Sequence, residues 1–287
     1  MSAPPKLDLA RRRNLRRRSQ LYVPGNEEKM ILKAATLEED SVILDLEDAV
    51  PAGEKEVARA IIKRLSNEID WGGRELCVRV NPVGSPEHVR DISLVNRLGA
   101  VHTVLVPKAE GDCSSVNKKS GKLIMPIVET AKGLMMLDAA VESSGITAIT
   151  FGAADYANSV GGSIDSYIGN QTIRTLLVAA ARSFGIEAID DVFFDLQDLE
   201  GFRRQASEAR SLGFSGKQVI HPSQIQMANL VFSPSNKEVR WAEKVVREFR
   251  RASKEKRGAI RVNGKLVDAV HYRLATGIIN RSTRDGS

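Results

Sequence analysis

Acidic side chains follow short apolar segments at several places along the chain. Glu47 ends Val-Ile-Leu-Asp-Leu-Glu, Glu129 ends Met-Pro-Ile-Val-Glu, and Asp155 ends Thr-Phe-Gly-Ala-Ala-Asp. Several carboxylates with few histidines suit Mg²⁺ or Mn²⁺, which prefer oxygen ligands, better than zinc. Because neighbouring strands lie about 4.8 Å apart, Glu129 and Asp155 are predicted to bind one such ion from adjacent strand ends. The alternative is that both carboxylates neutralise Arg79 and Lys108.

Basic side chains occupy comparable places. Arg79 lies in Val-Arg-Val-Asn, where strand alternation turns it away from its valine neighbours. It is expected there to bind a carboxylate or stabilise an oxyanion, and the structural alternative is an ion pair with Glu47 or Asp48. Lys108 raises a rival chemistry, because a desolvated lysine can form a Schiff base in a metal-free aldolase. His221, which precedes a proline, is either a general base or a turn residue.

The segments that carry these side chains alternate between two patterns. Eight are short and rich in β-forming residues, and helical patterns such as 54–68, 131–143, 168–184 and 196–212 separate them. The eight strands are predicted at 20–24, 41–47, 75–81, 102–108, 122–129, 148–155, 187–193 and 217–222. This alternation predicts a parallel sheet covered by helices, and eight units favour a closed (β/α)8 TIM barrel. Barrel chemistry lies at the carboxyl ends of the strands, where the polar residues stand.

The pattern divides the chain into three parts. Residues 1–18 form a basic N-terminal tail, residues 19–232 the barrel, and residues 233–287 a C-terminal helical extension and lid. Within the extension we expect a charged helix over 233–252, a polar connector over 253–258, a turn at Gly264 and a final helix over 266–279. This extension belongs to no strand–helix unit, so it packs either on its own barrel or on a neighbouring subunit.

Bulk composition narrows the function classes. The 287 residues are 42% hydrophobic and 27% charged, as in ordinary globular proteins, and no apolar run is long enough to span a membrane. Two cysteines make no disulfide framework, so the cytoplasm is the expected location. Six arginines crowd residues 11–18, either as a solvated tail or as contacts to ligand phosphates. Without interleaved aromatic residues, nucleic-acid binding is not expected.

Seven motifs occur in order at these strand ends. They are Leu-Tyr-Val-Pro-Gly (21–25), Val-Ile-Leu-Asp-Leu-Glu-Asp-Ala-Val (42–50), Val-Arg-Val-Asn-Pro (78–82), Val-Pro-Lys (106–108), Pro-Ile-Val-Glu-Thr-Ala-Lys-Gly (126–133), Phe-Gly-Ala-Ala-Asp (151–155) and Gly-Lys-Gln-Val-Ile-His-Pro-Ser-Gln (216–224). The set resembles the citrate lyase beta-subunit-like family, which includes malyl-CoA and citramalyl-CoA lyases. The resemblance implies a metal-dependent barrel that forms homotrimers or hexamers.

The resemblance also implies roles for individual residues. Glu129 and Asp155 would be the Mg²⁺ ligands, Arg79 would contact substrate and stabilise the enolate, and Glu47 and Asp48 would line and order the site. The stretch 263–271 looks like a lid that is shared between subunits, with Asp268 as the general acid/base in the neighbour's site. The Arg-Ser step before the first strand, Arg18-Ser19, implies that Arg18, and Arg17 near it, contact the CoA phosphates. The other residues expected to contact the substrate or CoA are Tyr22, Pro24, Lys29, Asp48 and His221.

Together these features predict a Mg²⁺- or Mn²⁺-dependent carbon–carbon lyase. It would cleave a 3-hydroxyacyl-CoA thioester such as malyl-CoA, citramalyl-CoA or citryl-CoA into acetyl-CoA, or a homologue, and a 2-oxo acid. Two alternatives stay open on the same scaffold: a thioesterase of the malyl-CoA type, and a citrate lyase subunit that is active only with partner subunits. The sequence leaves the acyl acid and the physiological direction undetermined.

Overall fold

The computed structural model describes residues 15–254 and 258–285 of the chain. The chain forms two compact units, of which the first ends at Phe232 and the second begins at Ser233. Within the described residues, no helix combines the length and the apolar character needed to cross a membrane.

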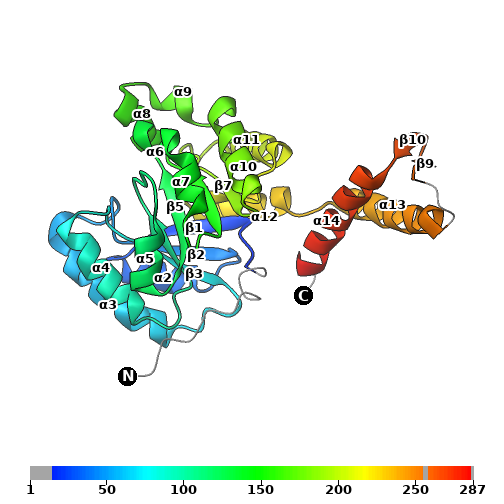
Figure 1. Ribbon diagram of the computed structural model, residues 1–287. Helices are drawn as coiled ribbons and strands as arrows, with labels where there is room; N and C mark the ends of the chain where they lie inside the picture. The colour runs from blue at the N-terminus through cyan, green and yellow to red at the C-terminus, as the bar shows by residue number, and fades with distance from the viewer. Residues whose placement is uncertain (1–14, 255–257, 286–287) are drawn as a thin grey trace. The chain divides into compact units, whose positions relative to one another are not determined.

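Eight parallel strands close into a barrel in chain order, and β8 pairs with β1. Helices surround these strands (Figure 1), so the predicted (β/α)8 TIM barrel is confirmed. Strands β2 to β8 end one to four residues earlier than predicted, because the polar residues that follow them form loops or begin helices. The strands are β1 Ser19–Pro24, β2 Ser41–Asp45, β3 Glu75–Arg79, β4 Thr103–Val106, β5 Leu123–Val128, β6 Ala148–Phe151, β7 Glu187–Asp190 and β8 Gly216–Val219.

Three of the predicted helices match α3, α10 and α11, whereas the predicted helix 131–143 is divided at Met136 into α6 and α7. Local sequence fixes several starts: Ser85 accepts a hydrogen bond from the His88 N–H and precedes Pro86 at the first turn of α4. The helices of this unit are α2 Glu28–Ala34, α3 Lys55–Glu68, α4 Pro86–Asn96, α5 Ser114–Ser120, α6 Ala131–Met135, α7 Leu137–Glu142, α8 Ala153–Val160, α9 Ile164–Tyr167, α10 Gln171–Ser183, α11 Leu199–Leu212 and α12 Ile225–Phe232, with 3₁₀ turns η1 Ala52–Glu54 and η2 Pro222–Gln224.

Side chains along each strand alternate between two apolar cores. In β2, Val42 and Leu44 pack with the surrounding helices, whereas Ile43 joins a separate cluster inside the barrel. That interior cluster also contains Cys77 and Ile127. Because side chains repeat with a period of two, residues two positions further along these strands also face the interior, nearer the carboxyl end. The fold thereby stacks polar residues above an apolar barrel interior.

Arg17 closes the opposite, amino-terminal end of the barrel and is 3% exposed. Its Nε and Nη2 atoms each donate to the Glu75 carboxylate at 2.7 Å, and Nη2 also donates to Thr147 Oγ1 at 2.9 Å. A third partner is Glu187, 3.1 Å from Nη1. A buried guanidinium requires such pairing, so Arg17 belongs to the barrel rather than to a solvated tail. Arg11–Arg13 lie outside the described residues.

The second unit is built from two helices and a hairpin. Helix α13 (Asn236–Lys254) and helix α14 (Ala269–Asp285) flank strands β9 (Ile260–Val262) and β10 (Lys265–Val267). The predicted final helix starts too early, because residues 265–267 pair antiparallel with 260–262. Asn263 and Gly264 form the turn with positive φ angles of 50° and 77°, the combination that two-residue hairpins favour.

Candidate active site

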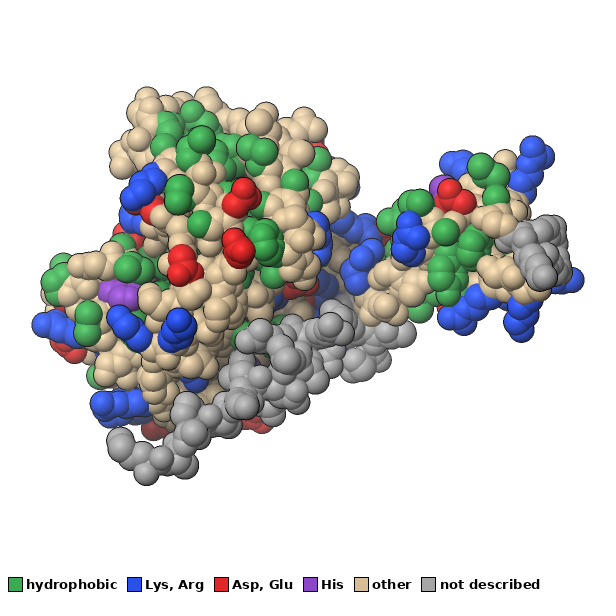
Figure 2. All heavy atoms as spheres, in the orientation of Figure 1, with side chains coloured by type: hydrophobic (Ala, Val, Ile, Leu, Met, Phe, Trp, Pro, Cys, Tyr) green, Lys and Arg blue, Asp and Glu red, His purple; other side chains and the backbone are tan. Residues whose placement is uncertain are grey.

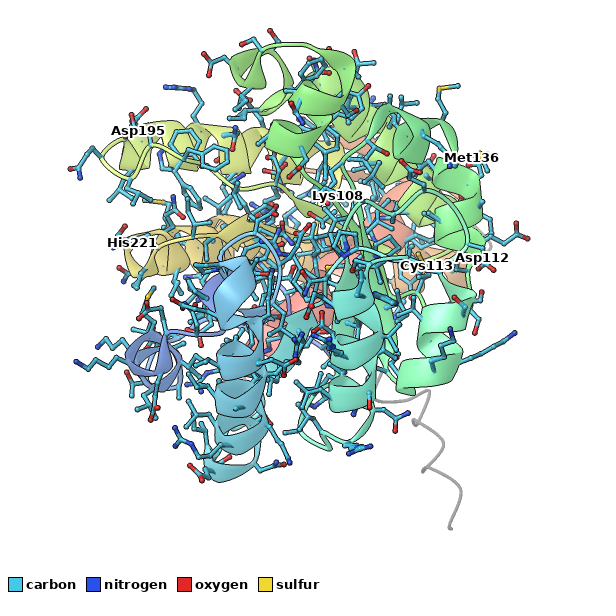
Figure 3. All side chains as sticks on the ribbon, turned by 90° about the vertical axis from the view of Figure 1, so that its left-hand side faces the viewer. Lys108, Asp112, Cys113, Met136, Asp195 and His221 are labelled. Atoms are coloured by element: carbon cyan, nitrogen blue, oxygen red, sulfur yellow. The ribbon has the colours of Figure 1, made fainter. Side chains whose placement is uncertain are left out.

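A pocket of about 270 Å³ opens at the carboxyl ends of the strands. Every strand except β4 contributes to it, either directly or through the residues that follow the strand. Figure 3 shows Lys108 near the centre of the barrel in that view, with His221 and Asp195 at the periphery. The lining residues are Tyr22, Asp45, Asp48, Ala49, Arg79, Ile127, Glu129, Phe151, Gly152, Ala153, Ala154, Asp155, Val192, Phe194, Gln218 and Ile220.

Arg79 is held rigidly in this pocket. Its Nε and Nη2 donate to the two oxygens of Asp45 at 2.7 and 2.6 Å, and Nη1 lies 3.0 Å from Glu47 Oε2. Its guanidinium carbon also stands 5.0 Å from the centre of the Tyr22 ring. Burial alone lowers the pKa of Arg79, but the hydrogen bonds to Asp45 keep it well above its ordinary value. The two hydrogen bonds to Asp45 use two of the five N–H donors of the arginine, and Nη1 is paired with Glu47 by charge only.

Lys108 brings a second cation to the mouth. Its Nζ lies 2.6 Å from Glu47 Oε1, 3.5 Å from Asp155 Oδ1 and 3.9 Å from Asp48 Oδ2. Burial lowers the pKa of Lys108, but the hydrogen bond to Glu47 outweighs burial and raises this pKa above its ordinary value. A Schiff base requires an unprotonated amine, so the geometry disfavours the metal-free aldolase.

Glu129 is a deeply buried acid of the pocket, at 2% exposure. Its Oε1 accepts a hydrogen bond from the backbone N–H of Lys108 at 2.7 Å, which Lys108 presents from a left-handed conformation with φ of 48°. Burial, followed by the negative charge of Glu47, raises the pKa of Glu129 to about 8. A Cβ at Gly152 would stand 2.3 Å from Glu129 Oε2, so only glycine allows this approach.

Asp155 lies beside Glu129, as predicted. It does not lie at the end of a strand, which is where the sequence had predicted it. It is the third residue of α8, and its charge contributes to the raised pKa of Glu129. No group of three or more His, Cys, Asp or Glu side chains suited to a metal ion occurs in the part of the chain that the structure describes. Two carboxylates are nevertheless enough for Mg²⁺, which keeps water or substrate in its other positions. The buried, uncompensated carboxylate of Glu129 fits a cation at this place.

The other predicted CoA contacts are dispersed. Arg18 stands before β1, at the amino-terminal end, where Nε and Nη2 donate to Asp40 at 2.8 Å each. This corrects the expectation that Arg18 and Arg17 bind CoA phosphates, because a residue that precedes a strand cannot reach the carboxyl end. Pro24 is half-buried and ends β1, and Lys29 is exposed on α2, the helix that follows. Both therefore lie at the same end of the barrel as the pocket.

His221 adopts the turn role that was its alternative. Its ring Nδ1 contacts Ser223 Oγ at 2.8 Å and accepts from the Ser223 N–H, which caps the 3₁₀ turn η2. The side chain is exposed and does not line the pocket.

Asp268 begins helix α14 in the second unit. Its Oδ1 accepts hydrogen bonds from the Val270 N–H at 2.9 Å and from the His271 N–H at 3.3 Å, as a helix N-cap does. The same oxygen lies 2.8 Å from His271 Nδ1, and this hydrogen bond lowers the pKa of Asp268. The side chain is 45% exposed.

Sequence reasoning assigned no role to two polar residues of the pocket, Asp45 and Gln218. Asp45 was visible as a candidate, because it ends β2 in register with Arg79 on β3 and both side chains face the interior. Gln218 lies on β8, two residues before Ile220, which follows the strand; both line the pocket. A neutral amide carries no signal comparable to a carboxylate, so its importance depends on what surrounds it.

Residues 18–222 match the model of the HpcH/HpaI aldolase/citrate lyase family. The chain belongs to this family. The family resemblance seen in the sequence motifs is thus confirmed. The predicted enzyme class, a lyase, is confirmed at the level of the family.

Among its relatives in the family, the mitochondrial citramalyl-CoA lyase of Rattus norvegicus is 33% identical over 98% of this chain and 90% of that protein. A (3S)-malyl-CoA thioesterase of Cereibacter sphaeroides is also 33% identical, over 88% of this chain and 90% of its own length. The crystal structure of protein CitE from Mycobacterium tuberculosis in complex with magnesium, acetoacetate and coenzyme A matches with a TM-score of 0.78 and 29% identity, covering 92% of this chain and 97% of that one. That neighbour holds both cofactors predicted here, magnesium and coenzyme A.

Proposed function

We propose that this family member is a Mg²⁺-dependent lyase that cleaves a 3-hydroxyacyl-CoA thioester such as malyl-CoA, citramalyl-CoA or citryl-CoA. The observation that carries the proposal is the burial of Glu129 beside Asp155 and Arg79 in one pocket, with a pKa raised to about 8. Such perturbed carboxylates gather where a protein binds a cation or moves protons. The products are acetyl-CoA, or a homologue, and a 2-oxo acid.

Glu129 and Asp155 would hold the magnesium ion, which supplies a Lewis acid for the oxygens of the 2-oxo acid portion. In the cleavage, the hydroxyl proton leaves, the carbon–carbon bond breaks to give the 2-oxo acid and a thioester enolate, and the enolate carbon takes up a proton. N–H groups of Arg79 that are not bonded to Asp45 would donate to the developing negative charge. Asp45 and Glu47 hold Arg79 in place and so act as positioning residues.

Asp268 is proposed as the acid that protonates the enolate carbon, acting from the lid of a neighbouring subunit. A carboxylate with a lowered pKa is a poor acid at neutral pH, so this role requires that burial in the assembled site replace the hydrogen bond from His271. The assembly proposed is a homotrimer or hexamer. Large apolar side chains exposed around the barrel support it, among them Met135 at 83% exposure, and Figure 2 shows apolar side chains gathered over the upper part of the barrel unit.

Contacts to the thioester are proposed from residues near the mouth. Tyr22 and Asp48 line the pocket, and Lys29 is an exposed cation on α2, which follows the carboxyl end of β1. This position supports the proposal that Lys29 contacts CoA phosphates. Cys77 and Cys113 are free and buried, which suits the cytoplasm as the location.

The second candidate, a thioesterase, is favoured by the thioesterase among the relatives. Both activities start from the same bound thioester, and they differ in whether water attacks the thioester carbonyl. A lyase releases a 2-oxo acid and keeps the thioester as acetyl-CoA, whereas a thioesterase releases free CoA and the intact hydroxy acid.

The test incubates the purified full chain with Mg²⁺ and malyl-CoA, citramalyl-CoA and citryl-CoA in turn, and measures 2-oxo acid and free thiol together. We expect 2-oxo acid without an equivalent of thiol, and loss of turnover in EDTA. Glu129→Gln and Asp155→Asn should abolish both Mg²⁺ binding and turnover, whereas Glu142→Gln, an exposed carboxylate on α7, should change neither. Full turnover of Glu129→Gln would contradict the metal assignment, and thiol without 2-oxo acid would establish the thioesterase.

A further inference from the structure

A buried lysine that does not line the pocket contacts the backbone beside Glu47. Lys55 is the first residue of α3 and is 9% exposed. Its Nζ atom donates to the backbone oxygens of Leu46 and Glu47 at 2.7 and 2.6 Å, and to Asn81 Oδ1 at 3.0 Å. An ammonium has three protons, so these three oxygens together account for all of its donors.

This position is an unfavourable one for a lysine. The first turn of a helix carries the positive end of the helix dipole, where acidic side chains are favoured over basic ones. Burial of the ammonium adds to the cost, and the three oxygens that Lys55 contacts are all uncharged. Natural sequences depart from such local preferences at functional sites, so the contacts of this ammonium indicate its purpose.

One of the three acceptors is itself fixed from behind. Asn81 Nδ2 donates to Asp91 Oδ2 at 2.7 Å and to the Leu46 oxygen at 2.8 Å, which turns its Oδ1 toward Lys55. Asp91 is fully buried, and its Oδ1 accepts from Arg59 Nη1 at 2.6 Å. Side chains of α3, of α4 and of the residues after β3 thus form one network that ends on the loop after β2.

That loop, residues 46–50, is held on its other side by the active site. Asp45 accepts hydrogen bonds from the N–H groups of Glu47 at 2.9 Å and Ala49 at 3.1 Å. The Glu47 carboxylate in turn contacts Arg79 Nη1 at 3.0 Å and Lys108 Nζ at 2.6 Å. The carbonyl that the ammonium binds and the carboxylate that faces two cations belong to one residue, so a shift of the loop moves that carboxylate away from the cations.

We infer that Lys55 is a positioning residue of the active site, which fixes the Glu47 carboxylate and through it the guanidinium of Arg79. This role rests on the proposed function, because it adds a residue to the same site. Lys55 acts through the 46–50 loop and does not line the pocket. Its removal should therefore impair the stabilisation of developing negative charge by Arg79, and leave Mg²⁺ binding by Glu129 and Asp155 intact.

The test compares substitutions of two buried lysines in the full chain. Lys55→Met keeps the length of the side chain without the ammonium, Lys55→Gln is one atom shorter and donates two hydrogen bonds, and Lys55→Arg keeps a cation. Lys122→Met is the matched control, because Lys122 is also buried and also donates to a backbone oxygen, that of Leu98. Lys122 precedes β5, so it lies at the end of the barrel opposite the pocket.

Steady-state kinetics with Mg²⁺ and the thioester separates positioning from stability. We expect Lys55→Met to lower kcat about 10- to 100-fold, with KM and the Mg²⁺ affinity each within about threefold, because the lost contacts serve the transition state. Lys55→Gln should lower kcat by a smaller factor, and Lys55→Arg should restore it to within about fivefold of the wild type. Lys122→Met should keep kcat within about twofold, although urea unfolding should show that it too is destabilised.

Hydrogen exchange followed by mass spectrometry tests the same role without turnover. Four N–H groups of the 46–50 loop donate hydrogen bonds within the fold, those of Leu46, Glu47, Ala49 and Val50. The peptic fragment that contains this loop should exchange about 10-fold faster in Lys55→Met than in the wild type, whereas fragments from β5 and β6 should not change. In Lys122→Met the loop fragment should exchange at the wild-type rate.

A Lys55→Met protein whose kcat stays within about twofold of the wild type would overturn the inference, because the lost contacts would then not serve the transition state. An equal loss of kcat in Lys122→Met, or wild-type exchange of the loop fragment in Lys55→Met, would also overturn it. If Lys55→Met does not fold, Lys55→Gln is judged by the same criteria. A wild-type protein that cleaves no thioester would refute the proposed function, and exchange of the loop fragment would then decide whether Lys55 holds the loop.

Discussion

Replacing Glu129 by glutamine is expected to remove a pH dependence from the stability of the metal-free protein. The pKa of Glu129 is about 8 in the folded chain, against 4.5 for an ordinary glutamate. The folded state therefore holds a proton that the unfolded chain releases between these values. Protonation of Glu129 stabilises the fold fully below pH 4.5, and this contribution is lost as the pH rises through about 8.

The size of the effect follows from the same two values. The interval from 4.5 to about 8, at about 1.4 kcal/mol for each pH unit, corresponds to about 5 kcal/mol. Solvent screens little of this, because Glu129 is 2% exposed. Glutamine keeps the shape of the side chain and an oxygen for the Lys108 N–H, but it does not titrate.

Urea unfolding in EDTA at intervals from pH 5 to pH 9 measures the difference. The free energy of unfolding of the wild type should fall by about 4 kcal/mol relative to Glu129→Gln over this range, because part of the full effect is already lost at pH 5. Adding Mg²⁺ at pH 8 should restore stability to the wild type and not to the variant, because only the carboxylate gains a cation. Parallel pH profiles for the two proteins would refute the reasoning, because they would show that Glu129 titrates alike in the folded and unfolded chains.

Three further substitutions follow from the ion pairs. Arg79→Lys should lower kcat/KM by about 100- to 1,000-fold, because an ammonium cannot keep the paired contacts to Asp45 and still donate to substrate; steady-state kinetics tests this, and a loss below tenfold would contradict it. Lys108→Met should destabilise the protein by about 1–3 kcal/mol in urea, since Glu47 loses the nearer of its two cationic partners. Borohydride should trap no substrate adduct in the wild type. Arg17→Met should cost about 3–5 kcal/mol of stability, because it strands Glu75, yet leave kcat within about twofold; a selective loss of turnover would show that the amino-terminal end takes part in catalysis.

The barrel was predictable because its signal is local and repeated. Each strand is a short apolar run, and the residues after it are polar wherever the pocket needs them, as with Glu47 and Glu129. The hairpin of the second unit was harder, because Leu266 and Val267 fit a helix equally well until they pair with residues 260–262. The Asn263-Gly264 step was the available sign, since both positions tolerate the left-handed backbone that such a turn requires.

The site was predictable in its charges and not in its neutral residues or its distant contacts. Arg79, Glu129 and Asp155 line one pocket, as expected from their places along the chain. Arg18 precedes β1 and pairs with Asp40 at the end of the barrel opposite the pocket, which the Arg-Ser step alone does not indicate. Gln218 could not be singled out in advance, because a neutral side chain in a short strand gives no sign of whether it lines a pocket or packs in the core.

The charge balance of the pocket links stability, metal binding and substrate binding. Four carboxylates line it, and the cations that face them are Arg79 in the lining and Lys108 at the mouth, so a divalent cation would lower the repulsion that an anionic acyl group meets. With its pKa at about 8, Glu129 is largely protonated at neutral pH in the metal-free chain. A cation that binds there must displace this proton, so its affinity rises with pH up to about 8. The same burial that destabilises the ionised metal-free site therefore makes substrate binding depend on the metal.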